Sequence, residues 1–455
     1  MKNKFYTLLV AIILYSIGSV AQEGTKTDSI RVNQYGQAVR FQPLNAEAQD
    51  GILKFTSADK SYSIWMDNRV QFDGEMFSND AFNPIGNGAS IRRARFAMKA
   101  ELWNNWYGEI DLDFSGSAVE LKDAYIKYTP DSDSWNIKAG HFKESFGMET
   151  TTTSRYLTFT ERSLMSKFDP SRHLGFQFNH WADKYLITAG LHFSTVGDNE
   201  EVVFTQDNNK DLGVDDGYSL TGRAVFIPIN DEDKVLHLGI AGTYRTPKVD
   251  LEIPYSYRFS TRSHSSINRK KYIDTDDILN VDNNTMVNFE LAGRYKGFMF
   301  QSEYKLVTVN RNDDLDAINF NGFYVQGAYL LFGGHHNYNA EEGEFTRITR
   351  GKEYGDLELA FRYDFVDAND FDNEIYGGSA EGYTVGLNYH VNPNVKFMLN
   401  YIYNNNDRFA NGKGKLYAGL DADGNLTKDP TNVFDADGNG GDDFGMAAFR
   451  IEIDF

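Results

Sequence analysis

Charged side chains alternate with apolar ones in two neighbouring stretches of the chain, and their chemistry is that of ion binding. Arg93, Arg95 and Lys99 share one parity within residues 91–103, and mostly apolar residues share the other. The next stretch places three carboxylates on one parity in the same way, those of Glu109, Asp111 and Asp113. Guanidinium and ammonium groups bind anions through charge-assisted hydrogen bonds, whereas carboxylates attract cations. These residues therefore predict a surface that attracts and binds ions.

Motifs of catalysis and of transition-metal binding are missing from the sequence. The nine histidines show no HExxH spacing, and the chain has no GxSxG, no Walker A motif and no plausible triad spacing. The chain has no cysteine, which excludes zinc–thiolate sites. We therefore predict that the protein is not an enzyme and carries no cofactor.

A pentapeptide near the C-terminus, DADGN, occurs twice and offers oxygen atoms at its first, third and fifth positions, as calcium loops do. Neither copy has the Gly and Glu that complete an EF-hand, and Asp-Gly is also an ordinary turn. A weak calcium site is thus one interpretation and a plain turn the other. The candidate ligands are Asp421, Asp423, Asn425, Asp435, Asp437 and Asn439.

The elements that position these side chains are predicted to be β-strands, because apolar and polar residues alternate with period 2 in segments of about the length that a tilted membrane strand needs. The last segment ends the chain on the apolar face, at Phe455. We predict sixteen strands, at 62–74, 89–103, 106–114, 119–129, 134–140, 173–181, 184–194, 218–228, 235–246, 284–295, 298–309, 321–332, 355–366, 380–391, 395–404 and 444–455.

The connections between these segments alternate between short and long, which is typical of a bacterial outer-membrane barrel with short periplasmic turns and long extracellular loops. Two connections break the alternation: residues 115–118 are short where a loop is due, and residues 333–354 are long where a turn is due. A basic group on the lipid face costs about 2 to 4 kcal/mol at mid-membrane, so the alternating charges must face the lumen. The predicted fold is an all-β transmembrane antiparallel barrel of about sixteen strands.

The ends and the composition agree with export to the outer membrane. Residues 1–21 predict a cleaved signal peptide, with Lys2 and Lys4 before an apolar run and small residues at the cleavage site. Residues 22–60 predict a periplasmic extension with little fixed structure, and residues 61–455 the barrel. Tyr, Phe and Trp make up 15% of the chain, in line with aromatic girdles. The net charge of −20 argues against nucleic acid as a partner. The terminal Phe455 predicts a signal for assembly into the outer membrane.

Two blocks of sequence resemble the phosphate-selective porin O and P family of Gram-negative outer membranes. The first, residues 91–164, contains IRRARFAMKAELW, LKDAYIKY, IKAGHFKESFGMET and TSRYLTFTERSL; the second runs from Tyr329 to Asp367. The resemblance implies a porin, usually a homotrimer, whose third outer loop folds into the lumen and narrows it. That loop is His141 to Arg172 here. The pore-lining and constriction residues that it implies are Arg93, Arg95, Lys99, Lys143, Arg155, Arg162, Lys167 and Arg172.

The function expected from these features is a water-filled channel for small ions and solutes, possible solutes being anions such as phosphate. Acids interleaved with the bases predict mild selectivity, and the outer membrane and its lipopolysaccharide are the expected partners. A basic run from Arg258 to Lys271 could fold inward, bind lipopolysaccharide phosphates, or be a solvated loop balanced by Asp274, Asp276 and Asp277. The alternatives are a barrel with an occluded lumen, acting in adhesion or structure, and an outer-membrane enzyme. Single-channel recording separates the occluded barrel from a porin.

Overall fold

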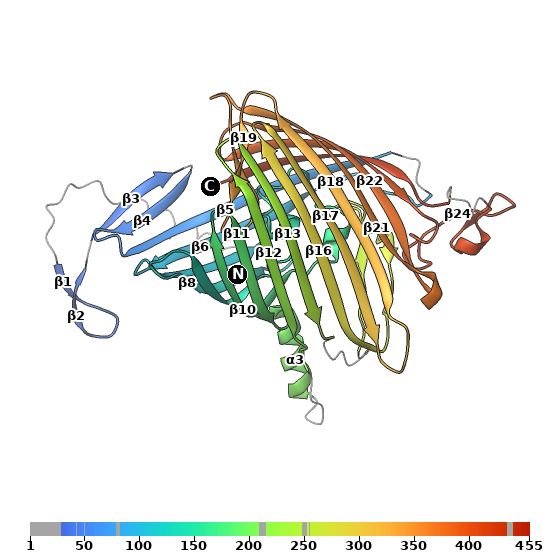
Figure 1. Cartoon of the computed structure of the whole chain (residues 1–455), viewed down its shortest axis with the longest axis horizontal. Coiled ribbons are helices and arrows are strands. Elements are labelled where there is room, and N and C mark those ends of the chain that lie inside the picture. The colour runs from blue at the N-terminus through green and yellow to red at the C-terminus, as the bar shows by residue number, and fades with distance from the viewer. Residues whose placement is uncertain are drawn as a thin grey trace, which may run out of the picture.

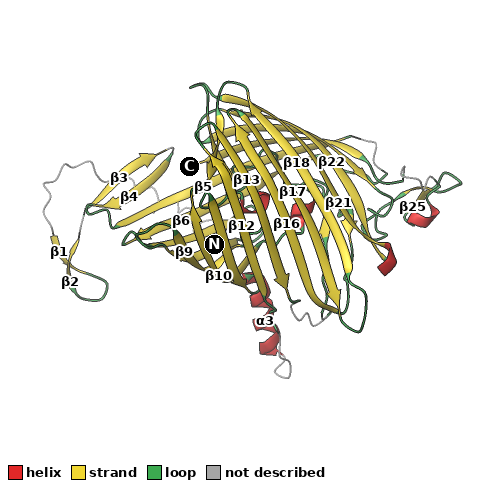
Figure 2. Ribbon diagram, viewed as in Figure 1, coloured by secondary structure: helices red, strands yellow, loops and turns green. Residues whose placement is uncertain are grey.

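The fold is known from a computed structural model, which describes residues 29–41, 43–49, 51–78, 82–208, 215–247, 253, 255–434 and 440–455. The predicted signal peptide lies outside the described residues. Sixteen of the described strands close into an antiparallel barrel, in which the last strand pairs with the first barrel strand. Figure 1 shows the tilted wall, and Figure 2 shows that it is built of strands, with helical turns inside it and beyond its ends. The predicted all-β barrel is confirmed.

The barrel strands follow one another along the chain, and each of the sixteen predicted segments coincides with one of them. They are β5 (Tyr62–Phe77), β6 (Gly88–Leu102), β7 (Trp106–Asp113), β8 (Glu120–Tyr128), β9 (Trp135–Lys143), β10 (Arg172–Ala182), β11 (Tyr185–His192), β12 (Ser219–Asn230), β13 (Lys234–Arg245), β16 (Val281–Tyr295), β17 (Phe298–Arg311), β18 (Ile318–Leu330), β21 (Asp356–Asp370), β22 (Ile375–His390), β23 (Val395–Asn406) and β26 (Phe444–Asp454).

The remaining described elements lie in the connections and at the N-terminal end. They are β1 (Ser29–Val32), β2 (Ala38–Phe41), β3 (Leu44–Gln49), β4 (Ile52–Ser57), α2 (Met148–Thr151), η1 (Met165–Lys167), α3 (Val196–Asn208), β14 (Ser260–Thr261), β15 (Ile273–Asp274), β19 (His335–Asn339), β20 (Glu344–Thr349), η2 (Phe371–Asn373), β24 (Gly419–Leu420), β25 (Leu426–Thr427) and η3 (Pro430–Asn432). None of the described helices has the length and apolar character that crossing a membrane requires.

The prediction of little fixed structure before the barrel is wrong for residues 29–32, 38–41, 44–49 and 52–57, which form two hairpins. The first turns at Asn33, whose side-chain oxygen accepts hydrogen bonds from the backbone N–H groups of Tyr35 and Gln37, both at 3.0 Å. The second pairs through β4 with β5, so β3 and β4 extend the sheet beyond the barrel (Figure 1).

The barrel closes through a charged contact on its inner side as well as through backbone pairing. Arg450 of β26 donates two hydrogen bonds to Asp73 of β5, each 2.7 Å long, and both side chains are buried. Two parallel N–H···O bonds fix the planes of the two groups relative to each other. The closing contact thus joins residues from opposite ends of the barrel sequence in a single register.

Three connections fold into the lumen or across its outer end. We call them the lumen loop (residues 144–171, between β9 and β10), the cap loop (residues 246–280, between β13 and β16) and the inserted hairpin (residues 331–355, between β18 and β21). Apolar residues of the lumen and cap loops pack together against β16, β17, β18 and β21, and the lumen loop meets Phe345 of the inserted hairpin in a second cluster. The apolar core therefore lies inside the barrel, on the side of these strands.

Candidate functional site

The lumen loop leaves one wall of the barrel and is tied to the opposite one. Its backbone N–H groups at Thr160 and Leu164 donate to side chains of Asn400 on β23 and Asp364 on β21, both at 2.8 Å. Asp169 of the loop pairs with Lys305 of β17. Since each anchor satisfies a buried polar group, the loop is held across the lumen rather than lying over its rim. The loop begins three residues later than the predicted start, because β9 continues to Lys143.

A central cavity of about 630 Å³ remains between the lumen loop and the wall of β5 to β10. The structure brings all eight predicted site residues together around this cavity: Arg93, Arg95, Lys99, Lys143, Arg155, Arg162, Lys167 and Arg172. In all, eleven basic and seven acidic side chains line it. The lining is thus locally positive in a chain whose net charge is −20.

Several cations of the wall are paired with carboxylates of nearby strands. Arg95 lies 3.2 Å from Asp111, and Lys99 lies 2.6 Å from Asp67. Arg172, the first residue of β10, lies 2.8 Å from Asp123. The carboxylates of Glu109, Asp111 and Asp123 come within 4.8 Å of one another, as metal ligands would. Each of them has a basic partner within 4 Å, so these carboxylates act as counter-ions here.

Four cations of the central cavity have no carboxylate within 4 Å among the residues described: Arg93, Lys138, Lys143 and Arg162. Arg93 donates to the side-chain oxygen of Gln71 at 2.6 Å, and Lys143 lies 3.5 Å from the carbonyl oxygen of Thr151. Arg162 donates to the carbonyl oxygens of Glu149 and Thr152. Neutral acceptors position these cations without cancelling their charge, so they stay able to attract an anion.

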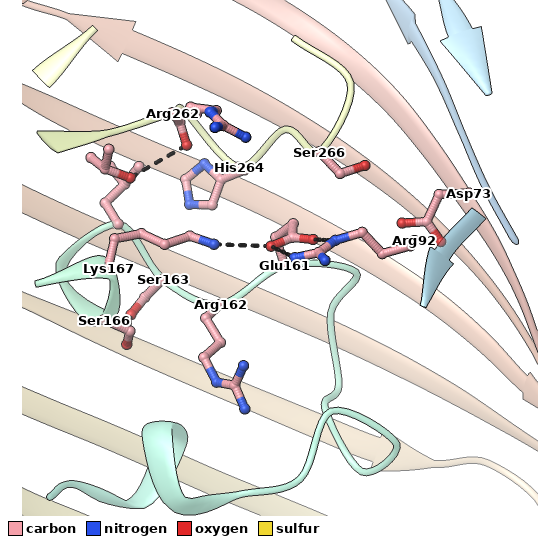
Figure 3. Close-up of polar contacts among 12 residues, drawn as sticks. Asp73, Arg92, Glu161, Arg162, Ser163, Ser166, Lys167, Arg262, His264 and Ser266 are labelled. Carbon is pink, nitrogen blue, oxygen red and sulfur yellow. Dashed lines mark hydrogen bonds and ion pairs between the residues drawn. The ribbon is translucent and has the colours of Figure 1, made fainter. Parts of the chain in front are cut away.

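Arg92 is an inward-facing cation that strand alternation could not identify. A register shift in the pairing of β5 with β6, next to Gln71, lets Arg92 face the lumen beside Arg93. Arg92 and Lys167 contact Glu161 at 2.6 and 3.0 Å, and Figure 3 shows them on opposite sides of that carboxylate, with Arg162 pointing away. Burial raises the pKa of Glu161, but these two cations outweigh burial and hold the pKa well below its usual range. The Glu161 group is thus a fixed negative charge.

The inserted hairpin contributes two more lining residues that the sequence analysis did not identify, Glu342 and Glu344. Arg223 of β12 donates to the carbonyl oxygens of Glu342 and Gly343 at 2.9 and 2.8 Å, and Arg294 of β16 donates to that of His336 at 2.8 Å. The long periplasmic connection that broke the alternation is therefore a second element of the pore interior. Burial, followed by the nearby Glu342, raises the pKa of Glu344 to about 8.

This pKa leads to a pH dependence of ion preference. Below about pH 7 the Glu344 carboxyl is mostly protonated and neutral, and above its pKa it is negative. Raising the pH from about 6.5 to about 9 is therefore expected to shift the ion preference of the lumen toward cations. Reversal potentials in a salt gradient measure this, and Glu344→Gln should abolish the change. An equal pH response in wild type and variant would assign it to other groups.

The cap loop crosses the outer end of the lumen, and its basic run from Arg258 to Lys271 shows features of two of the predicted arrangements. Part of the run folds inward, because His264 is buried and contacts Asp364 and Asn404 at 2.7 and 2.8 Å. Arg258 pairs with Asp274 at 2.6 Å, as a balanced loop would. Figure 3 places Arg262 and His264 on one side of the Glu161 contacts.

Two further cavities adjoin the central one. An outer cavity of about 490 Å³ shares Lys167, Asp169, Pro170 and Ser171 with it, and an inner cavity of about 420 Å³ shares Arg155 and Tyr156. All the shared residues belong to the lumen loop. The three cavities are thus arranged one after another along the lumen loop.

The first calcium candidate forms a hairpin turn between β24 and β25. The Asp421 carboxylate accepts hydrogen bonds from the backbone N–H groups of Asp423 and Asn425, at 3.0 and 2.8 Å. The second copy, with Asp435, Asp437 and Asn439, lies outside the described residues. Calcium binding by either copy stays a prediction.

Comparison with known proteins places this geometry in a family. Residues 64–423 match the sequence model of the family described as phosphate-selective porin O and P. Porin O of Pseudomonas aeruginosa is 25% identical to this chain over 418 residues, covering 83% of this chain and 90% of that protein.

Solved structures share the fold at low sequence identity. The trimer form of OmpT, an outer membrane protein of Vibrio cholerae, has a TM-score of 0.50 and 9% identity, covering 87% of this chain and all of that one. OmpF of Salmonella typhi, solved in complex with daunomycin, has a TM-score of 0.50 and 12% identity, covering 87% of this chain and 98% of that one. These two likenesses concern the barrel fold alone.

Proposed function

We propose that the channel formed by this chain conducts small anions, phosphate among them. The chain belongs to the phosphate-selective porin O and P family and is therefore an outer-membrane porin. The observation that carries the proposal is the basic excess around the central cavity, together with the four cations that have no carboxylate partner among the described residues. A fixed positive charge lowers the barrier for an anion in a confined passage of reduced dielectric constant. The seven acidic groups of the lining oppose this effect, so the preference is mild.

The experiment that tests the proposal is a reversal-potential measurement on the purified protein in a planar bilayer, in a potassium chloride gradient with and without phosphate. We expect conductance steps and a potential of the sign that anion preference gives. Added phosphate should reduce the chloride current by competing for the central cavity. A cation-selective potential would contradict the proposal, and the absence of conductance steps would favour the occluded barrel.

The oligomeric state that we propose is a homotrimer, formed through the wall of β7, β8 and β9. These strands have only eight, nine and nine residues, against fifteen in β16 and sixteen in β22. About 9 to 11 residues are needed to span the bilayer, so the strands of this wall are at or just below the minimum length. A shallow apolar groove of about 390 Å³ runs along it, lined by small residues such as Ala100, Gly108 and Ala124. A second copy of the chain would cover this face better than lipid.

Lipopolysaccharide is the second partner that we propose. Arg269 and Lys271 of the cap loop are exposed at the outer end of the barrel. Guanidinium and ammonium groups at that height suit the phosphates of the outer leaflet.

An enzymatic role has no support from any catalytic motif in the sequence, and we propose that the chain acts as a channel alone.

A further inference from the structure

Five aromatic rings follow one another along the inner wall of the barrel, and we call them the aromatic arc. They are Trp65, Tyr107, Tyr125, Phe142 and His192, on β5, β7, β8, β9 and β11. The successive centroid distances are 6.0, 5.8, 5.9 and 5.5 Å. All four lie within the 4.5–7 Å range of direct ring contact. The arc is therefore a continuous row of rings, in which Phe142 and His192 are fully buried and the other three are partly exposed.

Lysines accompany the rings of the arc. Lys127 lies 5.2 Å from the ring centre of Tyr107, and Lys138 lies 5.2 Å from that of Tyr125. The two tyrosine hydroxyls contact the same carboxylate, that of Glu109, at 2.6 and 3.0 Å. Because the hydroxyls are engaged there, the rings are held in place and each has an ammonium group close by.

The arc is not the surface on which the lumen loop packs. The buried apolar residues of that loop, such as Phe146, Leu164 and Phe168, belong to clusters on the side of β16 to β21. Trp65, Tyr107 and Tyr125 are only half-buried, and Tyr107 and Tyr125 line the central cavity. Apolar ring surface that faces water is unfavourable unless a partner covers it for part of the time. The lumen-facing positions of a porin are ordinarily polar, so partly exposed rings at these positions offer apolar surface to a solute.

We propose that the central cavity binds phosphorylated sugars, with the sugar against the aromatic arc and the phosphate on the cations beside it; this rests on the proposed anion channel. The C–H face of a sugar ring is apolar and packs on an aromatic face, whereas a phosphate takes charge-assisted hydrogen bonds from ammonium and guanidinium groups. Lys138, Lys143 and Arg162 all line the cavity, and the described residues place no carboxylate within 4 Å of them.

The size of the cavity and the exit from it fit a solute of this class. About 630 Å³ lies within the usual range of small-molecule sites, roughly 300 to 1,000 Å³. Carboxylates of Asp67 and Glu109 also line the cavity and suit the hydroxyl groups of a sugar. At the junction with the inner cavity, Tyr156 and Arg155 again provide an aromatic ring and a cationic group. The same pair of chemical groups thus recurs along the path.

The test compares three probes in single channels: glucose 6-phosphate, inorganic phosphate and uncharged glucose. The wild-type protein is expected to hold glucose 6-phosphate about fivefold longer than phosphate, the factor that one ring contact provides, and glucose only briefly. Tyr107→Leu with Tyr125→Leu should remove this difference. Tyr107→Phe with Tyr125→Phe is the matched control: it keeps the rings, loses the hydroxyls and should retain the difference.

Equal residence of glucose 6-phosphate and phosphate in the wild-type channel would overturn the inference, and so would a leucine variant that keeps the difference. If the double leucine variant does not assemble, the wild-type comparison and Tyr125→Leu alone still decide. The reversal potential is measured in the same bilayers. Anion preference without discrimination between the two phosphates defeats only this inference, whereas cation preference defeats the proposed function.

Discussion

Replacing Arg155 and Arg162 together by glutamate is expected to abolish the anion preference of the channel and to shift its ion preference toward cations without closing it. Both side chains line the central cavity, where Arg155 lies 2.7 Å from Asp67 and Arg162 donates to backbone carbonyl oxygens. One unit charge is worth about 1 to 2 kcal/mol to an ion several ångströms away at an effective dielectric constant of 20. The permeability ratio should therefore change by about tenfold or more, which the reversal potential in a salt gradient measures.

A control with the same change of charge separates a local effect from a global one. Lys184 and Lys296 are exposed in the periplasmic turns after β10 and β16, and Lys184→Glu with Lys296→Glu should leave the ion preference nearly unchanged. Arg155→Glu alone serves if the double variant folds poorly, because Arg162 also ties the backbone of the lumen loop. If the double variant kept the parental preference, the run from Arg258 to Lys271 would become the better candidate for the selective element.

Removing Phe455, or replacing it with aspartate, is expected to lower the assembled fraction in the outer membrane by about tenfold, which corresponds to ~1.4 kcal/mol. The backbone N–H and C=O of Phe455 both pair with Asn68 of β5, at 3.1 and 2.7 Å, so this residue completes the seam of the barrel. Its side chain is half exposed, at 49%, on the outer face. Deletion removes both hydrogen bonds, and aspartate places a charge on the lipid face.

Heat-modifiable electrophoresis and surface labelling of cells measure the assembled fraction. Phe455→Tyr keeps an aromatic ring at the terminus and should assemble normally. Phe434→Asp makes the same chemical change at an exposed position of the last outer loop and should also have little effect. Normal surface exposure of Phe455→Asp would show that the terminal ring is not needed for assembly.

The strands could be predicted because each contacts lipid on one side and the polar lumen on the other, which imposes period 2 on the sequence. β6 shows this, since Phe96 and Met98 are exposed on the outer face while Arg93 and Arg95 line the cavity. The pattern fails locally at Arg92, where the register shift against β5 turns a residue of the wrong parity inward. Alternation holds no information about such a shift.

The interior of the barrel was less predictable, because the inserted segments are positioned by contacts far away in the sequence. The length of the inserted hairpin was visible as an exception to the alternation of turns and loops. Its inward direction depends on Arg223 and Arg294, which hold its carbonyl oxygens from two other strands. Burial of Glu344 follows from that placement, and so does its altered pKa. The second hairpin before the barrel was also hard to predict, because its place depends on the pairing of β4 with β5 as well as with β3.

The three cavities lie one after another, so their electrical resistances to the flow of ions add in series. In such an arrangement the narrowest element dominates the total resistance, so widening either of the other two changes the current little. Charge acts differently, because an ion must pass every element, and an unfavourable field at any one of them raises the barrier for the whole path. The lumen loop lines all three cavities, and it can therefore affect both the conductance and the ion preference of the whole path.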